Sequence, residues 1–132
     1  MFDEALRIVI SKSWNSETCV PSLREKWSEE NPSLGQCAIT ALVVNDFLGG
    51  NIMRCMSSTG SHYYNFIDNE IMDFTREQFG EETPDYEHGE ERSREYLLGN
   101  EDTKARYTRL VNNVRENISI NKKRCLEKDD KW

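Results

Sequence analysis

The sequence predicts an α+β fold, in which a buried central helix packs on a small antiparallel sheet and is flanked by further helices. Residues 37–48, CAITALVVNDFL, are apolar nearly all round a helix, which is typical of a buried helix. Three short β-prone segments follow it directly along the chain, as in an antiparallel meander. Amphipathic segments near both ends supply the flanking helices. With 132 residues, the chain is expected to form one domain.

The first half of the chain is expected to hold two helices separated by a loop. Residues 3–14 predict a helix, with one apolar face made by Leu6, Val9, Ile10 and Ser13. Residues 15–34 are loop-like, with one or two helical turns in 23–30. The central helix is expected to open at Cys37 and to end at Gly49-Gly50, because glycine adopts the left-handed conformation easily at a helix end.

The second half is expected to hold the sheet and two more helices. Strands are predicted over residues 51–57, 62–67 and 70–75, the last two joined at Asp68-Asn69. Residues 76–91 are acidic and irregular, and a short helix follows over 93–98. A longer helix starts at Asn100 or Asp102 and ends near Asn117. Its apolar face consists of Tyr107, Leu110, Val111 and Val114. Residues 1–118 thus form the domain, and 119–132 a charged tail that is expected to fray from residue 121.

Composition narrows the classes of partner. The chain carries 17 basic and 24 acidic residues, a formal charge of −7, which disfavours binding to phosphate backbones and predicts no nucleic-acid partner. No apolar stretch approaches membrane-spanning length, so no membrane partner is expected. The N-terminal residues lack the features of a signal peptide, which predicts a cytoplasmic protein. The oligomeric state is left open.

Cysteine usage favours free thiols. The four cysteines lie at positions 19, 37, 55 and 125, with no closely spaced pair. Without a secretory signal, reduced thiols are the better interpretation. The cysteines and histidines also lack the paired spacing of zinc ligands, so neither a metal site nor a cofactor is predicted.

Cys37 is the candidate nucleophile, because it falls at the first turn of the central helix. The positive end of the helix dipole and the free N–H groups there favour the thiolate, which is the reactive form. The same N–H groups can stabilise an oxyanion that forms on a substrate carbonyl. Gly35 permits close approach of a substrate backbone at this point. The alternative is that Cys37 is a small buried hydrophobe at the start of a core helix.

His62 is the candidate base, since His88, the other histidine, lies in the acidic irregular stretch and is expected to be exposed. The alternative is a structural histidine that is bonded to a backbone carbonyl.

Asp73 would orient the imidazole of His62 if the loop between the last two predicted strands has two residues. With a two-residue loop at 68–69, Tyr64 pairs with Asp73, and His62 becomes its diagonal neighbour on the same face, about 7–8 Å away at the backbone.

A longer loop would break this arrangement. With three loop residues the register moves by one, Asn65 pairs with Asp73, and His62 faces the other side. The alternative role for Asp73 is to cap the turn at residues 75–77.

Several segments resemble the YunG-like family of small bacterial proteins. They are GQCAITALVVNDFLGGNI, SHYYNFIDNEIMDFTREQF, SREYLL and TKARYTRL, and they extend over most of residues 5–111. The GQC-ALV-D-GG run combined with H-YN and D-T-QF is the specific part of this resemblance. The resemblance implies relatives but no activity.

A wider resemblance is to the papain-like superfamily of cysteine hydrolases, which includes transglutaminase-like and NlpC/P60-like enzymes. There a cysteine opens a buried helix, and a histidine and an acid follow on adjacent antiparallel strands. Cys37, His62 and Asp73 match that order, so the resemblance implies a papain-like minimal core. The short hairpin departs from that pattern, because it leaves little room for the substrate-binding loops of peptidases. Fold alone does not fix activity.

Four further residues are candidates for oxyanion or substrate binding. Gln36 could donate its amide to an oxyanion, and Asn31 lies six residues before the cysteine, where papain-like enzymes have an oxyanion glutamine. Tyr64 is expected to supply a core or pocket wall. Asn65 lies on the face opposite His62, so it is the poorer orienting group.

The pattern favours a cysteine-dependent amide hydrolase or acyl transferase that acts on a peptide or small amide through Cys37, His62 and Asp73. Hydrolysis, transfer and deamidation differ only in what resolves the acyl-thioester, so the substrate stays open. The alternative is a catalytically inactive binding or regulatory module on the same scaffold, for which Cys37 should be sealed from solvent. A third hypothesis is a redox sensor that pairs Cys37 with Cys55 or Cys19, which requires the two sulfurs to lie within bonding distance.

Overall fold

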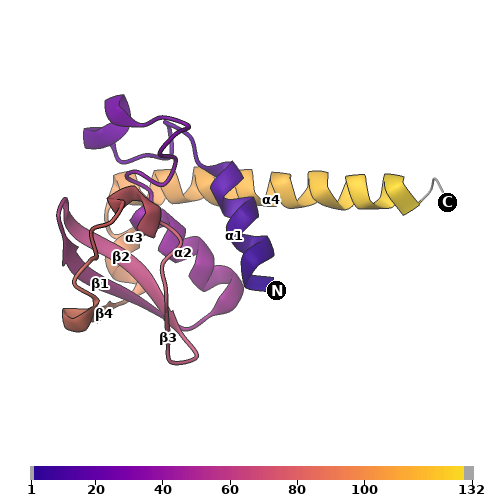
Figure 1. Ribbon diagram of the computed structural model, residues 1–132. Helices are drawn as coiled ribbons and strands as arrows, with labels where there is room; N and C mark the ends of the chain where they lie inside the picture. The colour runs from indigo at the N-terminus through magenta and orange to yellow at the C-terminus, as the bar shows by residue number, and fades with distance from the viewer. Residues whose placement is uncertain (1, 130–132) are drawn as a thin grey trace.

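A four-stranded sheet and the helix α2 (Cys37–Leu48) form the centre of the protein, as the computed structural model in Figure 1 shows. The structure describes residues 2–129, and the side chains of residues 4–120. The other helices are α1 (Phe2–Ser13), α3 (Arg94–Leu98) and α4 (Glu101–Asp129). Three 3-10 helices are η1 (Pro21–Lys26), η2 (Arg76–Phe79) and η3 (Tyr86–His88). The strands are β1 (Asn51–Ser57), β2 (Gly60–Ile67), β3 (Glu70–Met72) and β4 (Glu90–Arg92). The predicted α+β class and small antiparallel sheet are confirmed.

The sheet has the order β3-β2-β1-β4, with every neighbouring pair antiparallel. The first three strands form the expected meander. Strand β4 was not predicted, because its first two residues, 90 and 91, were assigned to the irregular stretch of residues 76–91. Its sequence, Glu-Glu-Arg, is polar throughout and shows no apolar alternation, since the strand joins the sheet edge through its backbone.

The β2–β3 hairpin has the two-residue loop on which the candidate site depends. Ile67 pairs with Glu70 and Asn65 with Met72, so the loop consists of Asp68 and Asn69 alone. Both loop residues have left-handed φ values, 52° and 64°, as two-residue hairpin turns require. The register condition for His62 and Asp73 is therefore confirmed.

Strand β3 ends at Met72, three residues before the expected end at Thr75. The cause is local, because the Asp73 carboxylate accepts hydrogen bonds from the Thr75 N–H and hydroxyl. Such bonds from a side chain to a nearby backbone group replace the strand ladder. Because β3 pairs only with residues 65–67, the first half of β2 has no partner strand on that side among residues 2–129.

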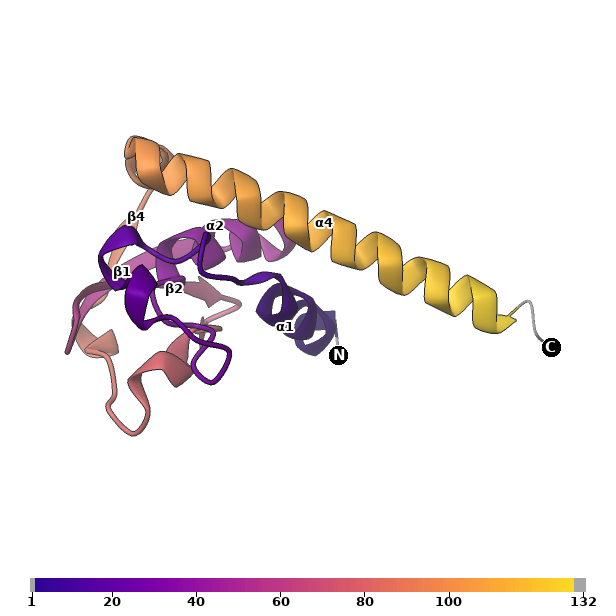
Figure 2. The same ribbon diagram turned by 90° about the horizontal axis from the view of Figure 1, so that it is seen from above.

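The main core lies between α2, α1 and α4. Helix α2 packs against β2 on one side and α4 on the other, and α1 packs against α4 (Figure 2). The predicted apolar faces of both flanking helices are confirmed, because Leu6, Val9 and Ile10 of α1 and Leu110, Val111 and Val114 of α4 are buried there. Burying this surface is the main force that holds α2 in place.

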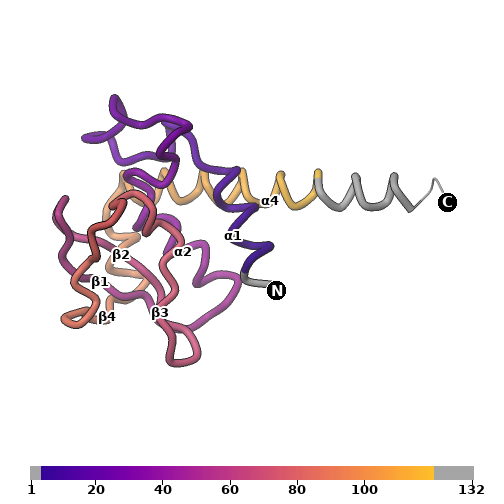
Figure 3. Tube along the Cα trace, in the orientation of Figure 1, coloured from indigo at the N-terminus to yellow at the C-terminus, as the bar shows by residue number. Residues whose placement is uncertain are grey.

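Helix α4 is longer than predicted. It continues to Asp129 instead of ending near Asn117. Residues 118–129 contain no glycine or proline, so nothing in that segment stops a helix. Residues 130–132 of the expected tail lie outside the described part of the chain, and its separation from the domain stays a prediction. The loop of residues 14–36 lies beyond the N-terminal end of α2 (Figure 3).

Candidate functional site

His62 and Asp73 form a buried hydrogen-bonded pair. Their side chains are 0% and 3% exposed, and His62 Nε2 lies 2.6 Å from Asp73 Oδ2. Asp73 Oδ2 also accepts a hydrogen bond of 2.6 Å from the Tyr86 hydroxyl. Asp73 Oδ1 accepts the N–H and hydroxyl of Thr75 at 3.1 and 3.2 Å. The carboxylate is thus held by four donors, two on each oxygen.

These bonds determine where the ring of His62 carries its proton. A carboxylate only accepts hydrogen bonds, so Nε2 is the nitrogen that donates to Asp73. In the neutral ring Nδ1 is then left with a free lone pair. Nδ1 is buried and has no hydrogen-bond partner within the described residues. The Cys37 thiol is close enough to the ring to raise its pKa, although it falls outside the geometry of a formed hydrogen bond.

The site favours the charged form of His62. Burial lowers the pKa of the imidazole, but the bond to Asp73 and the interaction with Cys37 outweigh it and raise the pKa from 6.5 to about 9. The ring is also held by its neighbours. The Phe79 ring meets it edge-on at 4.8 Å between centroids, and the Tyr64 ring stacks at 6.2 Å. The ring of His62 is therefore mainly charged at neutral pH.

Cys37 occupies the first turn of α2, as predicted. The first hydrogen bond there runs from the Thr40 N–H to the Gln36 carbonyl at 3.0 Å, so the amides of residues 37–39 precede the helical ladder. Gln36, at the N-cap, does not cap them with its side chain. These amides can therefore point toward a negatively charged group near Cys37.

A pocket of about 280 Å³ opens beside Cys37, whose side chain is half-buried. Its walls come from the loop before α2, from the first turn of α2, and from β2, η2 and α4. They include Gly35, Ala38, Ser61, Tyr63, Gln78 and Arg106. Gln78 connects the loop before α2 to the segment that starts η2. Its side chain accepts the Gly35 N–H at 3.3 Å and donates to the Thr75 carbonyl at 3.0 Å. Cys37 is thus accessible to a small molecule.

None of the four secondary candidates lines this pocket. Gln36 is fully buried and donates to the Asn15 carbonyl at 3.1 Å, so its amide is committed to the preceding loop. Asn31 lies in a turn whose backbone bonds to Ser28 and Leu34. Tyr64 is buried behind the ring of His62. The burial of Tyr64 agrees with the expected core role, and the roles of Gln36, Asn31 and Tyr64 in oxyanion or substrate binding stay predictions.

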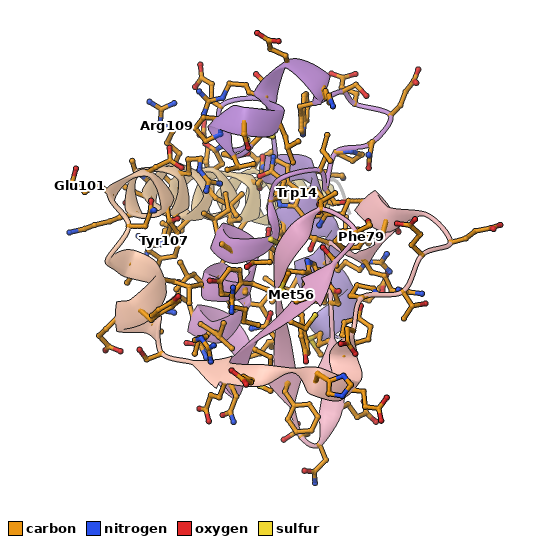
Figure 4. All side chains as sticks on the ribbon, turned by 90° about the vertical axis from the view of Figure 1, so that its left-hand side faces the viewer. Trp14, Met56, Phe79, Glu101, Tyr107 and Arg109 are labelled. Atoms are coloured by element: carbon orange, nitrogen blue, oxygen red, sulfur yellow. The ribbon has the colours of Figure 1, made fainter. Side chains whose placement is uncertain are left out.

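Asn65 lies on the face of β2 opposite His62, as expected, and donates to the Ala41 carbonyl of α2 at 3.0 Å. It anchors the helix to the sheet. Figure 4 makes the two faces visible, with Phe79 on one side of the sheet and Tyr107 of α4 on the other. The side of Phe79 is the side of His62 and Asp73.

Two residues of the site, Gln78 and Tyr86, were not predicted. Gln78 falls in the D-T-QF pattern, so the pattern was noticed but its contacts were not assigned. The bonds from Thr75 to Asp73 match the turn cap that was the alternative role for Asp73. Tyr86 lies in the acidic stretch of residues 76–91, where no local signal separates it from a surface tyrosine. Burial and its bond to Asp73 raise the pKa of Tyr86, so the phenol stays a proton donor.

The other described cysteines differ from Cys37. Cys19 and Cys55 are free and buried, and burial raises the pKa of both thiols, that of Cys55 to about 11. They therefore stay protonated and unreactive near neutral pH. Over the described residues, no three His, Cys, Asp or Glu side chains gather closely enough to hold a metal ion. Nor does any helix in that part of the chain combine the length and apolarity needed to cross a membrane.

Comparison with known proteins gives one family. The family described as YunG protein matches residues 3–119. The Bacillus subtilis (strain 168) protein named "Uncharacterized protein YunG" is 40% identical over 76 residues, which are 58% of this chain and 62% of that protein. The chain thus matches less than two thirds of that relative's length. No solved structure gives a significant match.

Proposed function

This chain belongs to the YunG protein family, and we propose that it is a cysteine-dependent amide hydrolase or acyl transferase. Cys37 is the nucleophile, His62 the general base and acid, and Asp73 the group that orients the imidazole. One observation carries the proposal. The bond from His62 to Asp73 assigns the ring proton to Nε2, and Nδ1 is left without a partner in a ring that interacts with the half-buried Cys37 thiol at the pocket.

The proposal includes a distant relation to papain-like cysteine hydrolases. It is supported by the order of the three residues and by their elements, a cysteine at the start of a buried helix and the other two on and just after adjacent antiparallel strands. The small size of the hairpin argues for a small amide or a chain end as the substrate.

In the first half of the reaction, the Cys37 thiolate attacks the carbonyl carbon of a bound amide. The C=O electrons move onto oxygen, where the free amides of the first turn of α2 stabilise the charge. The C–N bond then breaks as His62 gives its Nδ1 proton to the leaving nitrogen. The products are a thioester on Cys37, a free amine and a neutral imidazole.

In the second half, His62 Nδ1 takes a proton from water or from a second amine as that nucleophile attacks the thioester. Collapse of the intermediate expels the Cys37 thiolate and restores the protonated ring. Water yields hydrolysis, whereas an amine yields transfer. Throughout, Asp73 holds the ring and stabilises its positive charge.

The test measures the reactivity of Cys37. An ordinary thiol with a pKa of about 8.5 is ionised to only about 0.3% at pH 6. We expect iodoacetamide to alkylate Cys37 at pH 6 at least tenfold faster than such a thiol, as followed by peptide mass spectrometry. Cys19 and Cys55, both buried, serve as internal references. His62→Asn should bring the rate down to the ordinary level.

A second probe tests acyl transfer directly. With p-nitrophenyl acetate, the wild-type protein should release about one equivalent of nitrophenol in a burst and carry an acetyl group on Cys37. Cys37→Ser should show neither. His88→Asn is the matched control, since His88 is the other histidine and its side chain is 75% exposed. Ordinary alkylation together with no acetyl adduct would favour the inactive binding module.

A further inference from the structure

The pocket beside Cys37 differs in charge from the protein as a whole. The chain carries a formal charge of −7, yet no carboxylate lines this pocket among the described residues. Its one charged wall residue is Arg106 of α4. The remaining polar walls are neutral, and they include Ser22, Thr59 and Thr103. A ligand in this pocket therefore meets one cation and several neutral hydrogen-bonding groups.

Arg106 is unusually buried and rigidly held for an arginine. Only 6% of it is exposed. Its Nε donates to Asp102 at 2.7 Å, and its Nη1 donates to the Thr18 carbonyl at 3.0 Å. Those two bonds fix the plane of the guanidinium. The third nitrogen, Nη2, has no protein acceptor within the described residues, and it is not among the atoms sealed from solvent.

We propose that this pocket recognises small amides that carry a carboxylate, with Arg106 binding the carboxylate while the amide lies at Cys37. This inference rests on the proposed function and names its substrate class. A guanidinium with its plane already fixed binds a carboxylate through charge-assisted hydrogen bonds at little cost in side-chain entropy. A volume of about 280 Å³ suits a molecule of amino-acid size or the end of a chain.

Asp102 affects how strongly Arg106 binds a ligand carboxylate. Its carboxylate pairs with the Nε edge of Arg106 from four residues away on the same helix and is 44% exposed. It holds the guanidinium in place, but its negative charge also opposes a second carboxylate. Removing that charge while keeping a hydrogen-bond acceptor should therefore strengthen the binding of an anionic ligand.

The experiment measures binding without turnover, by NMR titration of the Cys37→Ser protein. The two probes are N-acetyl-L-alanine and its neutral isostere N-acetyl-L-alaninamide. We expect the carboxylate to half-saturate at a concentration at least tenfold below that of the amide. Arg106→Gln in the same background should abolish this difference. Arg109→Gln, a change to a more exposed arginine on the same helix, should preserve it.

Asp102→Asn covers the case in which Arg106→Gln fails to fold, and it should lower the half-saturating concentration of the carboxylate several-fold. Equal binding of the two probes would overturn the inference. So would a preference for the carboxylate that survives Arg106→Gln. Because the readout is binding, the preference can hold even if the acyl-transfer chemistry at Cys37 fails its own test, and the two failures are distinguishable.

Discussion

The raised pKa of His62 predicts that the protein loses stability as the pH rises through the neutral range. The folded state holds the imidazole proton up to a pH of about 9, whereas an unfolded histidine releases it near 6.5. The stabilisation is therefore fully present below pH 6.5 and is lost as the pH rises through about 9. A carboxylate with a lowered pKa shows the opposite pH dependence, because its contribution to stability is lost as the pH falls.

The magnitude follows from the two pKa values. The difference between 6.5 and about 9 corresponds to about 3 kcal/mol in total. Between pH 6.5 and pH 8.5 the free energy of unfolding should fall by about 2 kcal/mol because of this one group. His62 is 0% exposed, so solvent screens the interaction with Asp73 very little. A loss of this size is a large fraction of the stability of a small domain.

Urea unfolding at a series of pH values measures the effect. We expect the midpoint to fall steadily from pH 6.5 to pH 8.5 in the wild-type protein and in His88→Asn, whose substituted side chain is exposed. In His62→Asn the same range should be nearly flat. If the wild-type protein showed no loss, or if His62→Asn kept the full slope, the assignment of a preferentially charged ring in the folded state would be wrong.

Two further predictions concern the groups around the pair. Tyr86→Phe removes one donor from Asp73 Oδ2, so the carboxylate acts more strongly on His62, and NMR titration should place the pKa of His62 higher than in the wild-type protein. The same change should cost about 1–2 kcal/mol in urea unfolding. Insertion of one glycine between Asp68 and Asn69 should shift the hairpin register and turn His62 away from Asp73. Rapid alkylation of Cys37 at pH 6 should then be lost, and unchanged alkylation would contradict the register argument.

The hairpin was predictable because its determinants are local. Asp68 and Asn69 are residue types that tolerate left-handed φ, and strand alternation then decides which side chains share a face. The buried helix α2 was equally predictable, because residues 37–48 are mostly apolar. In both cases the residues that decide the structure are neighbours in the sequence, so a pattern of a few residues is sufficient.

The rest of the site depends on contacts between distant segments. Tyr86 reaches Asp73 across 13 positions, and Gln78 reaches Gly35 across 43, so neither contact leaves a local signal. Asn31 was selected by its distance along the chain from Cys37. The loop before α2 instead folds on itself and binds Asn31 within a turn. Spacing in the sequence could not predict that path, because it is decided by how the loop packs on η2 and α4.

The pattern of satisfied and unsatisfied groups argues against a purely structural role for His62. A structural histidine was expected to bond to a backbone carbonyl, but Nε2 bonds to Asp73 and Nδ1 has no partner within the described residues. Buried polar atoms are nearly always hydrogen-bonded, and a buried charged pair is often replaceable by apolar residues without loss of stability. All four bonds to Asp73 are made, while Nδ1 has no partner in a ring that interacts with the Cys37 thiol. Stability alone gives no reason for leaving that position open, whereas proton exchange with a thiol requires it.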